Sequence, residues 1–391
     1  MFEKCKELQN YIVAVRRELH RVPEIGMNLP ETQAIIAREL DKMGVTYKKN
    51  QRDSGIIGEI KGAHPGKTIL LRADIDGLPI TEATGVDYTS KHENCMHACG
   101  HDAHGAMLLG ALKVLQENRE NIKGAVRFVF QTGEEICRGA RVAIEEGVLD
   151  GVDNVFGLHI GSIAGADVPA GTLVAVPGCC LASFDRFILR IRGAGCHGST
   201  PEKGVDPITI AANITLSLQE ILAREIPAMN PAVLTLGKIA GGAAYNVIPG
   251  EVVIEGTTRA LDDGVRKYLA KRIGEISKSV AEAYRGICEL EMDWGAPPVV
   301  NDPAMTELAQ NASVKALGQE HVMTSLAPLM GGEDFAYYLI ERPGAFMFLS
   351  SANPQKHTDG PHHNSQFNID EDVLYMGSAV FVSIVEEYFN S

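Results

Sequence analysis

The fold class is decided by residues 126–135, whose sequence is VRFVFQTGEE. The apolar run Val126–Phe130 predicts a buried strand, as found in a parallel sheet covered on both faces. A turn containing one glycine follows at once and carries the adjacent carboxylates Glu134 and Glu135. Open α/β sheets place their functional side chains just past the carboxyl ends of their strands. The stretch therefore predicts an α/β sheet with reactive groups at this edge.

The segments on either side of this strand alternate between strand and helix patterns. Strands are expected at 56–60, 68–73, 155–158 and 345–350, and helices at 2–20, 31–43, 104–116, 140–146, 303–317 and 370–388. Such alternation is typical of an α/β domain, a mostly parallel sheet flanked by helices.

A different pattern occupies residues 184–294. We expect a strand near 187–191, a helix at 207–223, strands at 233–239 and 251–259, a helix at 263–284 and a strand at 287–294. Strand–helix–strand–strand–helix–strand is the order of a ferredoxin-like α+β unit. The chain is therefore predicted to have a catalytic domain, residues 1–183 plus 295–391, into which a domain of residues 184–294 is inserted.

The composition excludes several classes of protein. Hydrophobic residues make up 45% of the chain and charged residues 22%, as in ordinary globular proteins. No apolar run approaches the roughly 20 residues of a membrane helix, and the net charge of −14 disfavours nucleic acid and anionic lipid as partners. The polar start of the chain predicts no secretion signal. Eight cysteines form no small disulfide framework, which favours a reducing, cytoplasmic location.

The densest group of reactive side chains is MHACGHDAH, residues 96–104. Cysteine and histidine at this spacing suit zinc and similar divalent ions. Two alternatives remain open at this point. The segment could be a helix start that is capped by Asp102 and has exposed histidines, or Cys99 could be a thiolate nucleophile with a histidine base.

Further polar residues follow other expected strands. They are Asp74 and Asp76, the pair Glu134 and Glu135, His159, and the pair His362 and His363. Each has an ordinary structural explanation on its own, such as a turn or a solvated helix start. Their convergence at one sheet edge favours a metal-dependent hydrolase, in which an ion activates water and a carboxylate moves the proton. The H-E-x-x-H motif of thermolysin-type proteases is absent.

A series of motifs in a fixed order resembles one known family across nearly the whole chain. They are RELHRVPE (17–24), RADIDGLP (72–79), CGHDAH (99–104), GEE (133–135), GLH (157–159), HGSTP (197–201), NVIP (246–249), GGEDF (331–335) and HNSQF (363–367). The chain resembles metal-dependent amidohydrolases that include hippurate hydrolase, auxin–amino acid conjugate hydrolases and N-acetyl-diaminopimelate deacetylase. It is more distantly similar to aminoacylase and carboxypeptidase G.

The resemblance implies a zinc-peptidase-like catalytic domain that holds two divalent ions per subunit, Zn²⁺ or Mn²⁺, with Co²⁺ and Ni²⁺ as alternatives. Its implied metal ligands are Cys99, His101, Glu135, His159 and His363. His363 is preferred to His362 because the family has its ligand just before an Asn or Ser.

The resemblance also assigns roles to residues that are not ligands. Glu134 is the implied general base and acid, and Asp76 orients a ligand. The inserted domain is implied to act as a lid and to form a homodimer, or a tetramer, in which His197 stabilises the oxyanion in the partner's site. The residues expected near the substrate are Asn246, Arg259 and Gly332.

We therefore predict a metal-dependent amidohydrolase that cleaves the amide bond of N-acyl amino acids or related conjugates. The first alternative is a dipeptidase or carboxypeptidase that acts on short peptides. Two others are a binding protein without turnover and a hydrolase that uses Cys99 as nucleophile; the latter would lose activity on alkylation but resist chelation.

Overall fold

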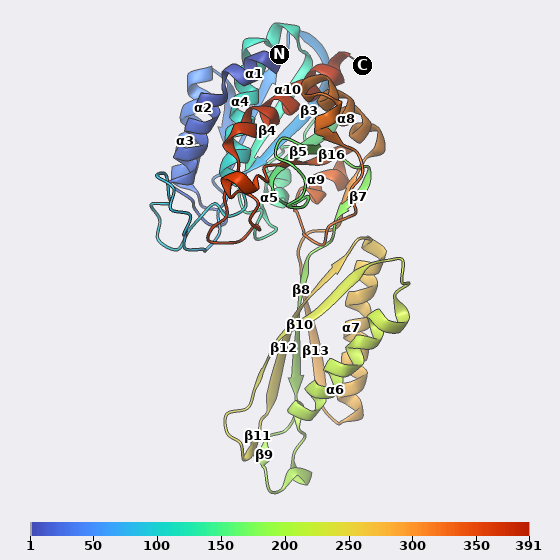
Figure 1. The fold of residues 1–391 in the computed structure, drawn as a ribbon. Helices are drawn as coiled ribbons and strands as arrows, with labels where there is room; N and C mark the ends of the chain where they lie inside the picture. Colours follow the sequence, from blue (N-terminus) through green and yellow to red (C-terminus); the bar gives the residue numbers. More distant parts are fainter. Residues whose placement is uncertain (1, 391) are drawn as a thin grey trace. The chain divides into compact units, whose positions relative to one another are not determined.

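A computed structural model describes residues 2–390 of the protein (Figure 1). The chain forms two compact units. The first unit comprises residues 1–178, 300–327 and 334–391, and the second comprises residues 179–299 and 328–333. The sequence-based boundaries of 184 and 294 remain a prediction about which residues fold as an independent domain.

The first unit is built on an eight-stranded sheet with the strand order β1-β2-β4-β3-β5-β16-β6-β15. Its strands are β1 (Thr46–Lys49), β2 (Ile56–Lys61), β3 (His64–Asp74), β4 (Lys123–Gln131), β5 (Asn154–Gly161), β6 (Leu173–Val174), β15 (Val322–Met323) and β16 (Gly344–Ser350). The central neighbours β4, β3, β5 and β16 run parallel, whereas β1, β2 and β6 form antiparallel pairs. The predicted α/β class with a mostly parallel sheet is confirmed.

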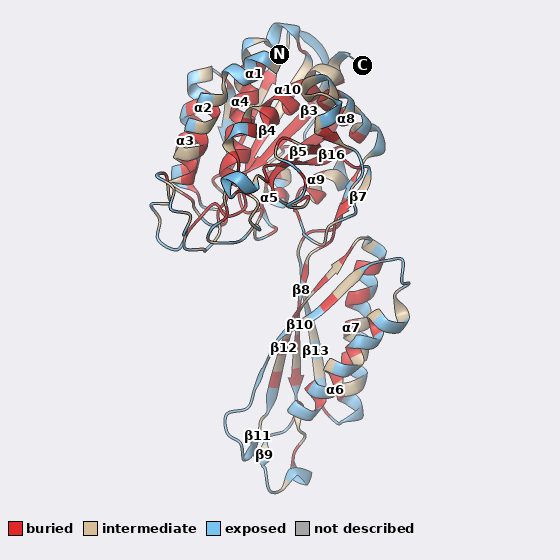
Figure 2. Ribbon diagram, viewed as in Figure 1, coloured by how far each residue is buried: buried red, intermediate tan, exposed pale blue. Residues whose placement is uncertain are grey.

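Helices of the first unit pack against this sheet or against one another. They are α1 (Phe2–Glu7), α2 (Gln9–His20), α3 (Pro30–Met43), α4 (His101–Glu117), α5 (Gly139–Glu145), α8 (Pro303–Leu317), α9 (Ala336–Glu341) and α10 (Leu374–Asn390). Helix α4 packs on β3 and β5 and is itself contacted by α2 and α10. Figure 2 shows the buried residues concentrated in the sheet and in the helix faces against it. The central strands, whose ends carry the polar residues, are thereby packed against helices.

Several helices differ from their predicted bounds, and α10 begins at Leu374 and not at residue 370. The segment expected as one helix over 2–20 is divided at Leu8 into α1 and α2. Helix α4 begins at His101 and not at His104, because Gly100 turns the chain with a φ of 87°. Only glycine adopts that conformation readily, and a Cβ on Gly100 would come within 3.0 Å of Ile160.

The second unit contains a four-stranded antiparallel sheet with the order β10-β12-β8-β13. Its main elements follow the chain order β8 (Asp185–Arg192), α6 (Pro207–Glu220), β10 (Ala232–Gly241), β12 (Glu251–Ala260), α7 (Asp263–Ala283) and β13 (Ile287–Trp294). The order of strands and helices is the one expected for a ferredoxin-like unit. Two short strands, β9 (Cys196–His197) and β11 (Val247–Ile248), pair at one end of this unit.

The remaining strands, β7 (Gly178–Leu181) and β14 (Val299–Asn301), pair with each other. All eight cysteines are free thiols. Within residues 2–390, every helix is too short or too polar to cross a lipid bilayer.

Candidate active site

The polar side chains of the first unit converge where its central strands end. Strand β3 ends at Asp74 and leads to Asp76, β4 ends at Gln131 and leads to Glu134 and Glu135, and α4 begins at His101. The structure differs from the sequence prediction at His159, which lies inside β5 and not after it, because β5 continues to Gly161.

Asp76 connects the turn after β4 to helix α4. Its Oδ1 accepts the backbone N–H of Glu134 at 3.2 Å, and its Oδ2 accepts that of Glu135, also at 3.2 Å. The same Oδ1 lies 3.3 Å from Nδ1 of His101. Burial raises the pKa of the Asp76 carboxyl. Asp76 therefore sets the positions of three predicted functional residues at once.

The bond to Asp76 determines which nitrogen of His101 is available. In the neutral ring, with Nδ1–H donating to the carboxylate, Nε2 has a free lone pair. Nε2 is buried and has no hydrogen-bond partner among residues 2–390. It lies 4.0 Å from Oε1 of Glu135. The ligand atoms of Cys99, His101 and Glu135 are all within 4.8 Å of one another, close enough for one ion to contact all three.

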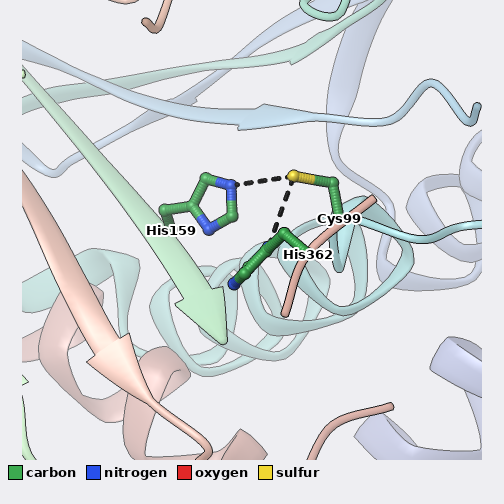
Figure 3. Close-up of side chains that lie close together, drawn as sticks. All are labelled: Cys99, His159 and His362. Atoms are coloured by element: carbon green, nitrogen blue, oxygen red, sulfur yellow. Dashed lines mark hydrogen bonds between the residues drawn. The ribbon is translucent and has the colours of Figure 1, made fainter. Parts of the chain in front are cut away.

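A second group of possible ligands shares Cys99. Figure 3 shows His159 and His362 pointing at its sulfur, with Nε2 of His159 at 3.4 Å and Nδ1 of His362 at 3.5 Å from Sγ. The other nitrogen of His159, Nδ1, lies 2.9 Å from the carbonyl oxygen of Ile160, which leaves Nε2 for a ligand. Gly161 makes room for His362, since a Cβ there would lie 2.2 Å from the imidazole ring.

The two adjacent histidines, His362 and His363, take different places. His362 completes the group with Cys99 and His159, whereas Nε2 of the half-exposed His363 lies 3.3 Å from Oε1 of Glu135. The choice of His363 as the ligand remains a prediction. The sequence reasoning missed the proximity of His362, although the doubled histidine was a visible signal.

The electrostatics of the cluster favour a cation. The Cys99 sulfur and the Glu135 carboxylate together raise the pKa of His363 to about 10. Burial lowers the pKa of His101, but Asp74, Asp76 and Cys99 together outweigh this effect, so that the net shift is upward. Anionic groups at these positions attract protons in the absence of an ion, and a divalent metal would displace them. Thiolate, imidazole and carboxylate are also the donors that Zn²⁺ accepts, so the residues fit a metal centre.

Glu134 is buried beside this cluster. Its Oε1 lies 3.4 Å from the backbone N–H of Asp334. Because side chains of neighbouring residues diverge, Glu135 can face the metal group while Glu134 serves another role. This division is the one expected for a ligand next to a general base.

The predicted residues of the second unit fall into two places. His197 on β9 is paired directly with Val247 on β11, and the carbonyl oxygen of Asn246 accepts the N–H of Gly198 at 2.8 Å. The backbone N–H of Ser199 donates to Nδ1 of His197 at 3.1 Å, so the ring proton of a neutral His197 is on Nε2.

Arg259 and Gly332 lie at the other end of the four-stranded sheet. The guanidinium carbon of Arg259 is 4.2 Å from the ring centre of Phe184. A Cβ on Gly332 would lie 2.7 Å from the Cβ of the same Phe184. The structure thus brings Arg259 and Gly332 together and separates them from His197 and Asn246.

Comparisons with known proteins agree with this geometry. The model of the peptidase family M20/M25/M40 matches residues 70–387. N-acetyl-L-cysteine deacetylase of Bacillus subtilis (strain 168) is 41% identical over 373 residues, covering 95% of this chain and 86% of the relative. IAA-amino acid hydrolase ILR1-like 5 of Arabidopsis thaliana is 37% identical over 391 residues, covering 98% and 88%. The crystal structure of the YXEP protein of Bacillus subtilis, a dinuclear metal binding peptidase from the M20 family, superposes with a TM-score of 0.83 at 33% identity, covering 98% and 99%.

Proposed function

This chain belongs to the peptidase family M20/M25/M40, and from that premise we propose that it releases an amino acid and a carboxylic acid from an N-acyl amino acid. It is a metal-dependent hydrolase of carbon–nitrogen bonds, as its relatives are. The observation that supports the proposal most directly is the cluster of Cys99, His101 and Glu135 next to the buried Glu134. We propose that the protein works in the cytoplasm.

The proposed metal ligands are Cys99, His101, Glu135, His159 and His363, and the ions are Zn²⁺ or Mn²⁺. When bound, two divalent ions lower the pKa of water and polarise the substrate carbonyl. Glu134 accepts the proton of the attacking water and returns it to the leaving amine. The backbone N–H of Glu134 donates to Asp76, which fixes its loop, and the backbone N–H of Asp334 faces its carboxylate at 3.4 Å.

We propose that the oxyanion is stabilised by Nε2–H of His197. A donor aimed at the charge that develops in the transition state lowers the barrier selectively. The bond from the N–H of Ser199 to Nδ1 supports this role, because it keeps the proton on Nε2. We also propose that Arg259 binds the substrate carboxylate, since its guanidinium group offers paired N–H donors.

These two roles cannot be filled by one copy of the second unit. His197 lies beyond the end of the sheet at which Glu251 of β12 pairs with Arg192. Arg259 is near the opposite end of β12. At about 3.3 Å per residue it lies roughly 26 Å from Glu251. The scissile nitrogen and the carboxylate of an amino acid are within roughly 3 Å of each other. We therefore propose a homodimer through the inserted domain, in which His197 of the partner subunit completes each site.

The test of the proposed reaction is amine release from a panel of N-acyl amino acids and dipeptides, with added Zn²⁺ or Mn²⁺ and again with a chelator. Metal-dependent release from N-acyl amino acids is expected. Preferential release from dipeptides would favour the dipeptidase alternative. The absence of release with any metal would contradict the proposal.

Mixing two inactive variants tests the shared site. Glu134→Ala and His197→Ala are each expected to be inactive alone. After subunit exchange, a mixed dimer contains one site with both residues intact, so about a quarter of all sites regain activity in an equal mixture. A mixture that stays inactive although exchange is complete would contradict the role of the partner's His197.

A further inference from the structure

His104 ends the cysteine- and histidine-rich segment, yet both of its ring nitrogens are already engaged. The backbone N–H of Ile160 donates to Nε2 at 2.8 Å. Nε2 must therefore be unprotonated, and Nδ1 carries the proton that it donates to Oδ1 of Asp74. Neither ring nitrogen of His104 has a lone pair left for a metal. His104 is therefore not a candidate ligand, although it is a histidine like the candidate ligands around it.

The ring of His104 is packed between two of the proposed ligands. Its centre is 5.2 Å from that of His101 in a stacked arrangement and 4.6 Å from that of His159 in an edge-to-face arrangement. All three side chains are buried. A shift of His104 would therefore move both ligand rings.

Asp74, the acceptor for His104, is held in turn by Arg72. Nη1 of Arg72 donates to Oδ2 of Asp74 at 2.8 Å, and Nη2 donates to Oδ1 of Asp334 at 2.9 Å. Both carboxylates and the guanidinium group are buried. The backbone N–H of Asp334 is the one that faces Glu134. Fully paired buried charges of this kind hold their partners in one geometry.

We propose that His104 is a positioning residue of the metal centre. Through Ile160 it fixes the end of β5, and thus the ligand His159, and by packing it fixes His101. Asp74 and Arg72 keep its tautomer and orientation. The proposal concerns metal binding by this chain alone and does not depend on which substrate is hydrolysed.

A matched pair of variants tests the contact with Ile160. His104→Gln keeps an oxygen acceptor near the place of Nε2, whereas His104→Met has a similar length without an acceptor. Loss of a residue that orients ligands typically weakens metal affinity 10- to 100-fold. We expect about this loss in His104→Met and a smaller one in His104→Gln, measured by competition with a chromophoric chelator for Zn²⁺. The Co²⁺ forms should differ in the thiolate charge-transfer band of Cys99.

Leu108→Ala on the same helix is the control for general destabilisation, because Leu108 is buried in the apolar core. It should lower the melting temperature without changing metal affinity. In the metal-free proteins, hydrogen exchange of residues 154–161 should be faster in His104→Met than in His104→Gln. If His104→Met does not fold, Asp74→Asn takes its place and should weaken Zn²⁺ affinity in the same direction. Wild-type Zn²⁺ affinity in the folded variants would overturn the proposal.

Discussion

Replacing Asp76 by asparagine removes a charge and one acceptor while keeping the size of the side chain. Asp76 now accepts the N–H groups of Glu134 and Glu135 and lies beside Nδ1 of His101. An asparagine can turn its single oxygen toward Glu134 and His101, as Oδ1 does now. Its NH₂ group must then face the N–H of Glu135, so that two donors oppose each other.

The expected magnitude follows from the lost bond. A hydrogen bond to a charged group contributes about 1.5–3 kcal/mol, and a buried donor left without an acceptor costs a similar amount. At about 1.4 kcal/mol per factor of ten, Asp76→Asn should weaken metal affinity or kcat/KM by roughly 10- to 150-fold. The loss arises because Glu135 and His101 are no longer held in place.

The assay is a Zn²⁺ titration of the metal-free variant, followed by kcat/KM with metal at saturating and at limiting concentration. A defect in positioning should be larger at limiting metal. Asp41→Asn is the matched control, because Asp41 is exposed and its carboxylate accepts a hydrogen bond from the Tyr47 hydroxyl at 3.0 Å. If Asp76→Asn bound Zn²⁺ and turned over substrate like the wild type, the reasoning would be refuted.

The variant Glu134→Gln should bind metal normally but have a kcat lower by at least about 100-fold, since general-base catalysis contributes that much. A kcat near the wild-type value would contradict the role of Glu134 as general base. Chelation should abolish activity and lower the melting temperature, and Zn²⁺ or Mn²⁺ should restore both. Activity that resists chelation but is lost on alkylation of Cys99 would instead favour the alternative in which the Cys99 thiolate is the nucleophile. Burial and the neighbouring Arg16 lower the pKa of His20, but its ion pairs with Asp102 and Glu82 together outweigh both effects and raise the pKa overall. These pairs should stabilise the fold fully below about pH 6.5 and progressively less as the pH rises through the raised pKa. The free energy of unfolding of the metal-free protein across pH 6–9 should therefore depend less on pH in His20→Gln than in the wild type.

Several elements could be predicted closely because their ends carry local signals. Pro30 begins α3, and Gly44 ends it with a φ of 64°. The bounds expected for α8 and β13 agree with the structure. The two-residue strands β6 and β15 were missed, since such short segments have no periodic pattern and depend on neighbours distant in sequence.

The convergence of three candidate donors was also predictable from the sequence. Cys99, His101 and Glu135 were expected at one sheet edge, and the structure brings them within 4.8 Å of one another. The position of His159 was misjudged because the apolar run ends before the strand does. The network of Arg72, Asp74 and Asp334 was missed, since nothing local shows that a buried arginine pairs with a residue more than 200 positions away.

The sequence by itself determined the fold class, the family motifs and the chemical kinds of candidate ligand, because these depend on residue type and spacing. Only the tertiary structure decided which nitrogen atoms are available. His101 and His104 stand three residues apart and are the same in type, yet Nε2 of His101 is without a hydrogen-bond partner among residues 2–390, while His104 is bonded at both nitrogens. The physical reason is that Nδ1 of each ring faces a carboxylate at or just after the end of β3, whereas only Nε2 of His104 also meets a backbone N–H, that of Ile160 in β5. A histidine becomes a ligand or a support according to the hydrogen bond that its other nitrogen makes.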